Sequence, residues 1–390
     1  MELLGRYYTS DVFSKLLVSQ FTINRPLNIV DLGVGGGALI RAAINRWTKA
    51  SYFVGDVDRK SIVKIQNELP FVNSFHLNTL KEEVSDKLNI KNGKVDIAIC
   101  NPPFLKVKNE ISYDDLFDDA NLSDCKNLKL LTSDVIFLAK NLQLLKQKGE
   151  LGIILPDSLI TGKEFMHLRN AILKEHNLKA IIELPEKIYA KTEALTHILL
   201  IEKGGTTSKR SPLFLADKTG QIIDEIEGDK SALCERMDYK YHLWKKKVAL
   251  IKENKVIGDL KIEIKRGSLT HKELKATKDY FIHTTEIINK KSNQATRNHF
   301  KKIDKYLLTQ KGDILLARVG RGCTGKVCMI SRGKVPISDC VYRIRVPKKF
   351  RMKVWNSLSS NEGQNWLKAN CHGVCAKVIS KRDLLKFPLQ

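Results

Sequence analysis

The sequence predicts an α/β protein with a doubly wound, largely parallel sheet and a second, smaller basic α+β domain. Three observations lead to this prediction. Short apolar runs alternate with amphipathic segments through the first half of the chain. A glycine-rich stretch follows the first apolar run, and an Asn-Pro-Pro corner follows the fourth. All of the excess positive charge lies beyond residue 235.

Hydrophobic periodicity gives the individual elements, because strands repeat every two residues and helices every 3.6. In the first half we expect strands at 27–33, 51–56, 73–77, 95–100, 149–156, 179–185 and 196–203, and helices at 38–47, 59–69, 130–146 and 168–176. Residues 204–212 form a loop by composition, and a hairpin is expected after it. Later in the chain, short strands rich in Gly and Lys are expected at 312–320, 325–331 and 340–346, and a helix at 354–367.

The charge distribution divides the 390 residues into two predicted domains, 1–235 and 236–390. The first has 31 Lys and Arg against 31 Asp and Glu, whereas the second has 36 against 12, a net charge of +24. A basic domain joined to a neutral one favours a polyanion as partner, and nucleic acid is the one we expect. A basic surface that is merely solvated is the alternative, and the sign of the charge does not separate DNA from RNA.

Several classes of protein are disfavoured by composition. No apolar run approaches the ~20 residues that a membrane helix needs, and the N-terminal residues lack the basic segment and apolar core of a signal peptide. The eight cysteines are scattered without zinc-ligand spacing, so we expect reduced thiols, no metal site and a cytoplasmic location.

The stretch DLGVGGGAL (31–39) predicts a ligand-binding loop between a strand and a helix. Gly33, Gly35 and Gly37 permit a tight turn and a close approach of backbone to ligand. Asp56 ends the next strand, where an acid can accept both hydroxyls of a ribose. The dinucleotide fingerprint has a different glycine spacing and a pyrophosphate. An acid before the first glycine, at Asp31, fits an adenosine cofactor with a positive centre better.

The stretch NPPF begins where the buried run 95–100 ends. Pro102 and Pro103 cannot continue a β-ladder, and Pro102 also restrains the backbone of Asn101. The planar amide of Asn101 is therefore held stiffly at the carboxyl end of a strand, where open α/β sheets bind ligands. A plain Pro-Pro turn that only ends the strand is the alternative interpretation.

These motifs resemble those of S-adenosylmethionine-dependent methyltransferases that modify N6 of adenine in DNA, and their order resembles the gamma class. The resemblance covers roughly residues 5–204 and implies a Rossmann-like class I methyltransferase sheet. GRYYTS (5–10) resembles the cofactor-contacting N-terminal segment, which implies contacts from Tyr8 and Thr9. HLNTL (76–80) matches the segment that contacts the cofactor adenine, with Asn78 in place of the usual acid. The implied cofactor site comprises Tyr8, Thr9, Asp31, Gly33, Gly35, Asp56, Asn78 and Asn101.

The resemblance also implies a mechanism. The target adenine is flipped out of the duplex, and its amino group donates to the Asn101 side-chain carbonyl and the Pro102 backbone carbonyl. Phe104 and Tyr189 stack on the flipped base. A core position for Phe104 and a surface position for Tyr189 are the alternatives.

From about Arg236 the chain resembles one half of the specificity subunit of type I restriction-modification systems. This similarity lies in the stretches ERMDYKYH, GDILLARVGRGCTGKV and ISKRDLLKFPL. It implies a target-recognition domain for double-stranded DNA. Basic residues there would touch phosphates, and one or two arginines would read guanine edges. The candidates are Arg318, Arg321, Lys326, Arg343 and Arg345.

The function predicted is a site-specific, adenine-specific DNA methyltransferase of a bacterial or phage restriction-modification system, with a separate restriction endonuclease as a possible partner. One alternative is methylation of adenine in RNA. Another is a modification subunit that is inactive without a separate specificity or nuclease partner. A protein glutamine target would hardly need so basic an appendage.

Overall fold

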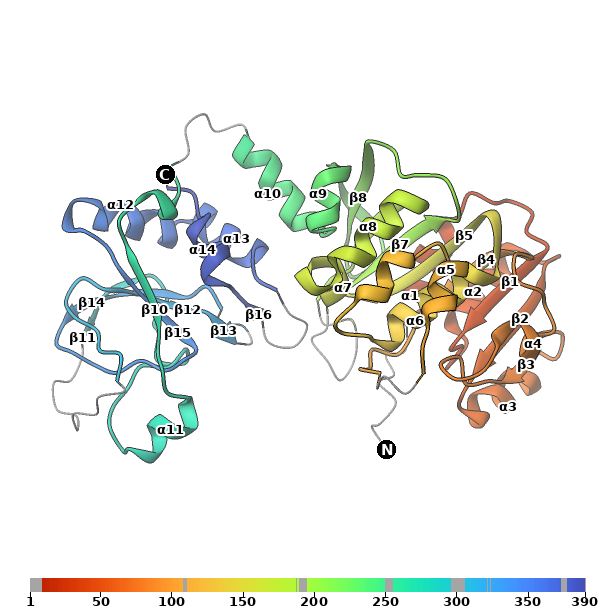
Figure 1. Ribbon diagram of the computed structural model, residues 1–390, viewed down its shortest axis with the longest axis horizontal. Helices are drawn as coiled ribbons and strands as arrows, with labels where there is room; N and C mark the ends of the chain where they lie inside the picture. Colours follow the sequence, from red (N-terminus) through yellow and green to blue (C-terminus); the bar gives the residue numbers. More distant parts are fainter. Residues whose placement is uncertain are drawn as a thin grey trace. The chain divides into compact units, whose positions relative to one another are not determined.

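The computed structural model describes residues 9–107, 111–186, 188, 195–249, 255–295, 306–320, 322, 324–372 and 377–389. Its contacts divide the chain into two compact units, Met1–His242 and Leu243–Gln390, which we call the first and the second unit (Figure 1). Over the residues described, no helix is both long and apolar enough to cross a membrane.

Among its described residues the first unit builds a nine-stranded sheet with the order β3-β2-β1-β4-β5-β7-β6-β8-β9. The strands are β1 Asn28–Leu32, β2 Ser51–Asp56, β3 Asn73–His76, β4 Val95–Cys100, β5 Leu145–Pro156, β6 Asn177–Glu183, β7 Thr196–Glu202, β8 Arg210–Ala216 and β9 Ile222–Asp229. Strands β1 to β5 pair in parallel, whereas β7 is antiparallel to both β5 and β6. The predicted doubly wound α/β sheet is confirmed.

The order of strands reverses between β1 and β4, which are adjacent and in parallel register, with Ile29 opposite Ile97 and Asp31 opposite Ile99. Chain segments that leave β1 and β4 therefore emerge side by side at one edge of the sheet. Such a switch point is where open α/β sheets bind their ligands.

Helices cover both faces of this sheet (Figure 1). On one face α1, α2 and α3 form a buried cluster with alternate strand residues such as Ile29 and Ile97, and α6 and α8 pack against the strands as well. The helices are α1 Asp11–Ser19, α2 Ala38–Arg46, α3 Arg59–Glu68, α4 Val84–Leu88, α5 Asp114–Asp119, α6 Ser133–Leu144, α7 Asp157–Thr161, α8 Met166–Glu175, α9 Lys230–Glu235 and α10 Tyr239–Ala249, the last running into the second unit.

Within its described ranges the second unit has a five-stranded sheet, β10-β15-β12-β14-β11, and a two-stranded one, β13-β16. Side chains of β12 alternate between two apolar clusters, since Ile314 and Leu316 enter one and Leu315 and Ala317 the other. Both faces of this sheet are therefore covered. The elements are β10 Glu263–Arg266, α11 His271–Ala276, β11 Lys291–Ala295, β12 Ile314–Ala317, β13 Val319–Gly320, β14 Val327–Arg332, β15 Val341–Arg345, α12 Lys348–Ser359, α13 Asn361–Ala369, β16 Lys377–Val378 and α14 Lys381–Leu385.

One predicted helix is wrong in its extent. The sequence favours a single helix over 354–367, but the structure has α12 and α13, with the break at Ser360. Ser360 has extended ψ of 162°, and its hydroxyl accepts the Gly363 N–H at 2.9 Å, which starts a new helix. A Cβ on Gly363 would lie 1.9 Å from the Ser357 carbonyl oxygen, so this tight junction requires glycine.

The segment 236–242 packs within the first unit, although charge places the predicted domain boundary before Arg236. Met237 is fully buried and its N–H donates to the Ile160 carbonyl at 3.0 Å. Tyr239 is also buried and donates its hydroxyl to Asp224, while Lys240 pairs with Glu183 at 2.6 Å. The buried guanidinium of Arg169 donates to the Cys234 and Glu235 carbonyls, which fixes the approach to this segment.

We therefore expect a fragment 1–249 to be more stable than a fragment 1–235. The shorter one loses burial of Met237 and Tyr239, worth about 1.5–3 kcal/mol for each large side chain. At about 2–4 °C per kcal/mol for a unit of this size, its thermal midpoint should fall on the order of 10 °C. Circular dichroism melts of both fragments, with Met237→Ala in 1–249 as a partial mimic, test this. Equal midpoints would show that the segment adds nothing.

Candidate functional site

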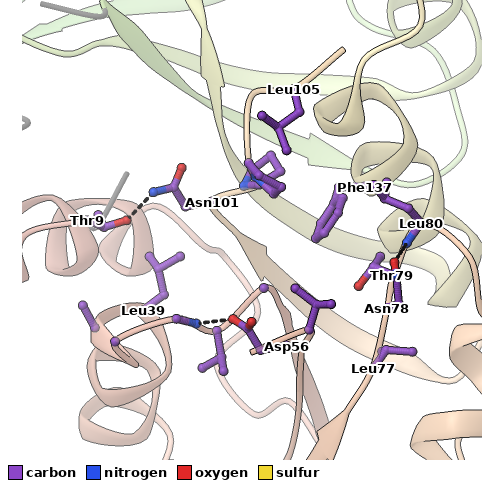
Figure 2. A pocket seen from close by; sticks show the side chains of 18 residues that line it. Thr9, Leu39, Asp56, Leu77, Asn78, Thr79, Leu80, Asn101, Leu105 and Phe137 are labelled. Carbon is purple, nitrogen blue, oxygen red and sulfur yellow. Dashed lines mark hydrogen bonds between the residues drawn. The ribbon is translucent and has the colours of Figure 1, made fainter. Parts of the chain in front are cut away.

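A pocket of about 360 Å³ lies at the carboxyl edge of the large sheet, where β1, β2 and β4 end (Figure 2). Most of its wall comes from four chain segments: the loop after β1, the end of β2 with the residue after it, the segment after β3 and the corner after β4. Thr9 before α1, the first residues of α2 and Phe137 of α6 complete the wall. The lining residues are Thr9, Gly33, Val34, Gly35, Gly36, Ala38, Leu39, Asp56, Val57, Leu77, Asn78, Thr79, Leu80, Asn101, Pro102, Pro103, Leu105 and Phe137.

The loop after β1 depends on glycine because its backbone turns through left-handed conformations. Gly33 has φ of 79° and Gly35 has φ of 51°, which side-chain-bearing residues rarely adopt. The N–H groups of Gly33 and Val34 donate to the Gly55 carbonyl of β2 at 2.7 and 3.2 Å. A Cβ on Gly33 would also lie only 3.3 Å from Cε1 of Phe137. The loop is thereby held flat against β2, and its backbone faces the pocket.

Asp56 fixes this loop from the neighbouring strand. Its side chain is buried, and its Oδ2 accepts the Gly35 N–H at 2.8 Å while its Oδ1 accepts the Asp58 N–H at 2.7 Å (Figure 2). The carboxylate is thus held in one orientation at the pocket wall. A carboxylate oxygen has further acceptor capacity after one such bond, so Asp56 can also receive hydroxyl groups of a ligand.

Asn101 begins the corner after β4, a strand that is buried at every position. Its amide Nδ2 donates to the Thr9 Oγ1 at 2.9 Å, which joins the corner to the segment before α1 (Figure 2). The side-chain carbonyl lies on the opposite side of the planar amide. Pro102 is buried and Pro103 half-buried, and both line the pocket. The geometry fixes an acceptor oxygen at the pocket edge.

Asp31 lies at the end of β1 beneath the glycine loop and is only 1% exposed. In the part of the chain that the structure describes, neither of its carboxyl oxygens has a hydrogen-bond partner. Burial, together with the charge of Asp56, raises the pKa of Asp31 well above its ordinary value. A buried carboxylate that accepts no hydrogen bond would be stabilised by a cationic group nearby, and such a group would lower the pKa of Asp31.

The predicted cofactor residues are largely brought together. Six of them line the pocket: Thr9, Gly33, Gly35, Asp56, Asn78 and Asn101. Asp31 lies two residues before Gly33 in the sequence but does not line the pocket. The Asn78 side chain folds back on its own turn, where its Oδ1 accepts the Leu80 N–H at 3.2 Å. Phe104 is half-buried and is not among the lining residues. Tyr8 and Tyr189 lie outside the described residues.

The apolar part of the wall was not predicted from the sequence. Phe137 comes from a helix whose residues are all buried, and nothing in its local pattern distinguishes it from the core. Leu39 and Leu77 lie within the stretches DLGVGGGAL and HLNTL but were not singled out there, and Leu105 follows the NPPF stretch without belonging to it. Only their position near the glycine loop and the Asn-Pro-Pro corner could have indicated that they line a pocket.

The basic candidates in the second unit occupy unequal environments. Arg343 is buried, where it pairs with Glu263 and donates to the Leu308 carbonyl at 2.6 Å. Arg345 forms two hydrogen bonds of 2.8 Å to Asp313. Arg318 stacks over the Tyr342 ring at 5.4 Å and donates to the Asp339 carbonyl. Lys326 is half-buried. Arg321 lies outside the described residues.

Other basic side chains of the second unit are more exposed than these. Four exposed basic residues lie within a short stretch of sequence: Lys265 and Arg266 of β10, and Lys272 and Lys275 of α11. The sequence did not distinguish them as nucleic-acid contacts, because exposed Lys and Arg are common at strand ends and on helix surfaces of any soluble domain.

The fold and the pocket together define a doubly wound α/β protein with a pocket at the switch point of its sheet, the place where proteins of this class bind ligands. The model of the family described as N-6 DNA Methylase matches residues 2–312. The chain belongs to this family.

Individual relatives are distant. The methylase subunit of the type I restriction enzyme MpnII of Mycoplasma pneumoniae is 21% identical over 58% of this chain and 45% of its own length. The type II methyltransferase M.BsuBI of Bacillus subtilis is 24% identical over 52% of this chain and 44% of its own. The chain thus matches less than half the length of these curated relatives. The structure of the type IIG restriction endonuclease BpuSI is similar in fold, with a TM-score of 0.50 and 10% identity, over 98% of this chain and 58% of that one.

The start of α6 contains a buried carboxyl that makes stability depend on pH. Asp134 is 1% exposed, and burial raises its pKa to about 6, although hydrogen bonds from Thr132 and the Val135 N–H act in the opposite direction. Because the folded pKa lies above the unfolded value, the stability that Asp134 contributes is complete below about pH 4 and is lost as the pH rises through about 6.

We therefore expect Asp134→Asn to stabilise the chain at neutral pH. The amide keeps an acceptor oxygen for the Thr132 hydroxyl and removes the cost of a buried charge, up to about 3 kcal/mol at 1.36 kcal/mol per pKa unit. The gain should shrink toward pH 4. Urea unfolding at pH 4.5 and 7.5 measures it, with the exposed Asp114→Asn as control. A gain that is equal at both pH values would contradict this origin.

Proposed function

We propose that this chain is a site-specific methyltransferase that transfers the methyl group of S-adenosylmethionine to N6 of a flipped adenine in duplex DNA, as in gamma-class enzymes with an NPPF motif. The observation that carries the proposal is the meeting of two motifs in one pocket. The glycine loop with Asp56 forms one wall, and the Asn101–Pro102 corner forms the other.

The residues present fit S-adenosylmethionine in three respects. The glycine loop offers backbone without side chains at the pocket wall. Asp56 is an oriented carboxylate that suits ribose hydroxyls. Asp31 is a buried carboxyl with no hydrogen-bond donor among the described residues, which suits a cationic ligand. When bound, the cofactor would supply an electrophilic methyl group on a sulfonium.

The protein's own contribution is to hold and orient the acceptor nitrogen. The exocyclic nitrogen of adenine is conjugated with the ring and is a weak nucleophile. Hydrogen bonds from its two N–H groups to the Asn101 side-chain carbonyl and the Pro102 backbone carbonyl favour a tetrahedral nitrogen with an available lone pair. Thr9 keeps the Asn101 amide in the required orientation. Placement of the two reactants supplies much of the rate, and stacking by Phe104 and Tyr189 would hold the flipped base.

The second unit is proposed as the target-recognition domain. Phosphates would be contacted by Arg318, Lys326, Arg345 and the exposed Lys265, Arg266, Lys272 and Lys275. Arg343 remains a predicted contact, although its guanidinium pairs with Glu263 inside the unit. Arg321 keeps its predicted role as well.

This proposal has two alternatives: a chain that is active only with a partner subunit, and a chain that acts on RNA. The relatives that are named methylase subunits of type I enzymes support the first alternative, in which this chain acts only with a separate specificity partner. A relative named as a type II methyltransferase favours independent action. RNA as the substrate is the other alternative, because positive charge alone does not separate the two nucleic acids.

The test is transfer of labelled methyl groups by the purified full chain to unmethylated duplex DNA and to RNA, with digestion to nucleosides. We expect N6-methyladenine in DNA. Asn101→Ala should lower turnover at least tenfold, because it removes an acceptor used in the transition state, and should leave cofactor affinity nearly unchanged. Asn28→Ala, at the amino end of β1, is the matched control. Label in RNA alone, or in DNA only after a specificity subunit is added, would support the alternatives. An Asn101→Ala variant that retains a tenth or more of wild-type turnover would refute the assigned role.

Cofactor binding gives an independent test. Asp56→Ala should weaken affinity for S-adenosylmethionine roughly ten- to a hundredfold, since a hydrogen bond to a charged acceptor contributes about 1.5–3 kcal/mol. Titration calorimetry measures the affinity. Asp58→Ala is the control, because Asp58 caps α3 and is not among the pocket-lining residues. Equal affinities of the two variants would remove Asp56 from the site.

A further inference from the structure

The corner after β4 cannot hold its own shape by backbone hydrogen bonds. Pro102 and Pro103 have no N–H to donate, and residues 101–105 belong to no helix or strand. Yet the direction of the Pro102 carbonyl has to be fixed if it is to accept a hydrogen bond from the target amine. Groups outside the corner must therefore hold it.

Ser133, the first residue of α6, makes these contacts. Its side chain is fully buried. The hydroxyl donates to the Pro103 carbonyl at 2.5 Å and accepts the Leu105 N–H at 3.0 Å. The Ser133 backbone N–H in turn donates to the Leu105 carbonyl at 2.9 Å. One side chain thus bonds to the corner on both sides of Phe104.

The segment before α6 extends this contact. The Val107 N–H donates to the Leu131 carbonyl at 3.0 Å, and Lys106 and Thr132 form an antiparallel bridge. Four residues after Ser133, Phe137 of the same helix lines the pocket and lies against Gly33. Because every residue of α6 is buried, the helix is a rigid link between the two walls of the pocket.

We propose that Ser133 is a positioning residue: its hydroxyl holds the Pro102–Pro103–Phe104 corner so that Asn101 and the Pro102 carbonyl face the acceptor nitrogen. This inference rests on the proposed function. Removal of the hydroxyl leaves the Pro103 carbonyl and the Leu105 N–H without this partner and allows the corner to move. A displacement of about 1 Å at reacting groups can cost on the order of a hundredfold in rate.

The chain offers a closely matched control in Thr207. Its side chain is also buried, and its hydroxyl donates to the His176 carbonyl and accepts the Leu178 N–H, both at 2.9 Å. Thr207→Val removes the same two kinds of bond at a site that does not line the pocket. It therefore reproduces the loss of a buried bridging hydroxyl without touching the corner.

The first experiment is hydrogen exchange of the full chain, followed in peptides that span 101–107. In Ser133→Ala the Leu105 amide should exchange at least tenfold faster than in wild type, whereas Thr207→Val should leave this peptide unchanged. Exchange that is equal in Ser133→Ala and wild type would overturn the proposal. This readout requires no activity, so it tests the contact of Ser133 with the corner separately from the proposed function.

The second experiment separates turnover from binding. Ser133→Ala should lower kcat for DNA methylation ten- to a hundredfold and change the dissociation constants of cofactor and DNA less than threefold. Ser133→Thr keeps the hydroxyl and should recover most of the rate and the protection, with its folding checked by thermal melting. A Ser133→Thr variant that melts like wild type but is as slow as Ser133→Ala would overturn the role of the hydroxyl. So would a Thr207→Val variant with an equal loss of kcat. A wild-type chain that methylates no adenine would instead refute the proposed function.

Discussion

The site depends on the parallel pairing of β1 with β4. Asp31 lies opposite Ile99 in this register, so both strands end at the same edge of the sheet. The glycine loop and the Asn101 corner are about seventy residues apart in sequence, and the pairing alone makes them opposite walls of one pocket. A slip by one residue would turn each side chain of a strand to the other face of the sheet.

The pocket walls are held from outside as well as by their own strands. Asp56 fixes the glycine loop through the Gly35 N–H, and Thr9 fixes the amide of Asn101. Ser133 bonds to the corner on the side of α6. Each of these bonds joins segments far apart in sequence, and together they orient polar groups that a flexible loop would leave mobile. Such preorganisation is what lets hydrogen bonds favour one arrangement of a reacting group.

Charge and packing divide the chain in different places. The excess of basic residues begins beyond residue 235, yet Met237, Tyr239 and His242 are buried in the first unit. The arginines of the second unit show the same contrast. Arg343 and Arg345 are part of its basic composition, but they form ion pairs with Glu263 and Asp313 on neighbouring segments. Net charge therefore indicates a class of partner, while the structure shows which side chains are exposed to meet it.

The sequence by itself determined the alternation of strands and helices in the first unit, the glycine loop, the stiff corner at Asn101 and the asymmetry of charge. These features are local, because periodicity, glycine conformation and proline geometry act within a few residues. Only the tertiary structure decided that Phe137 lines the pocket, that Ser133 bonds to the corner, that α12 ends at Ser359 and that Arg343 is paired. A serine at a helix start and a phenylalanine in a buried helix look alike in many proteins. Their roles come from long-range contacts that are set by strand register and helix packing, which no local pattern encodes.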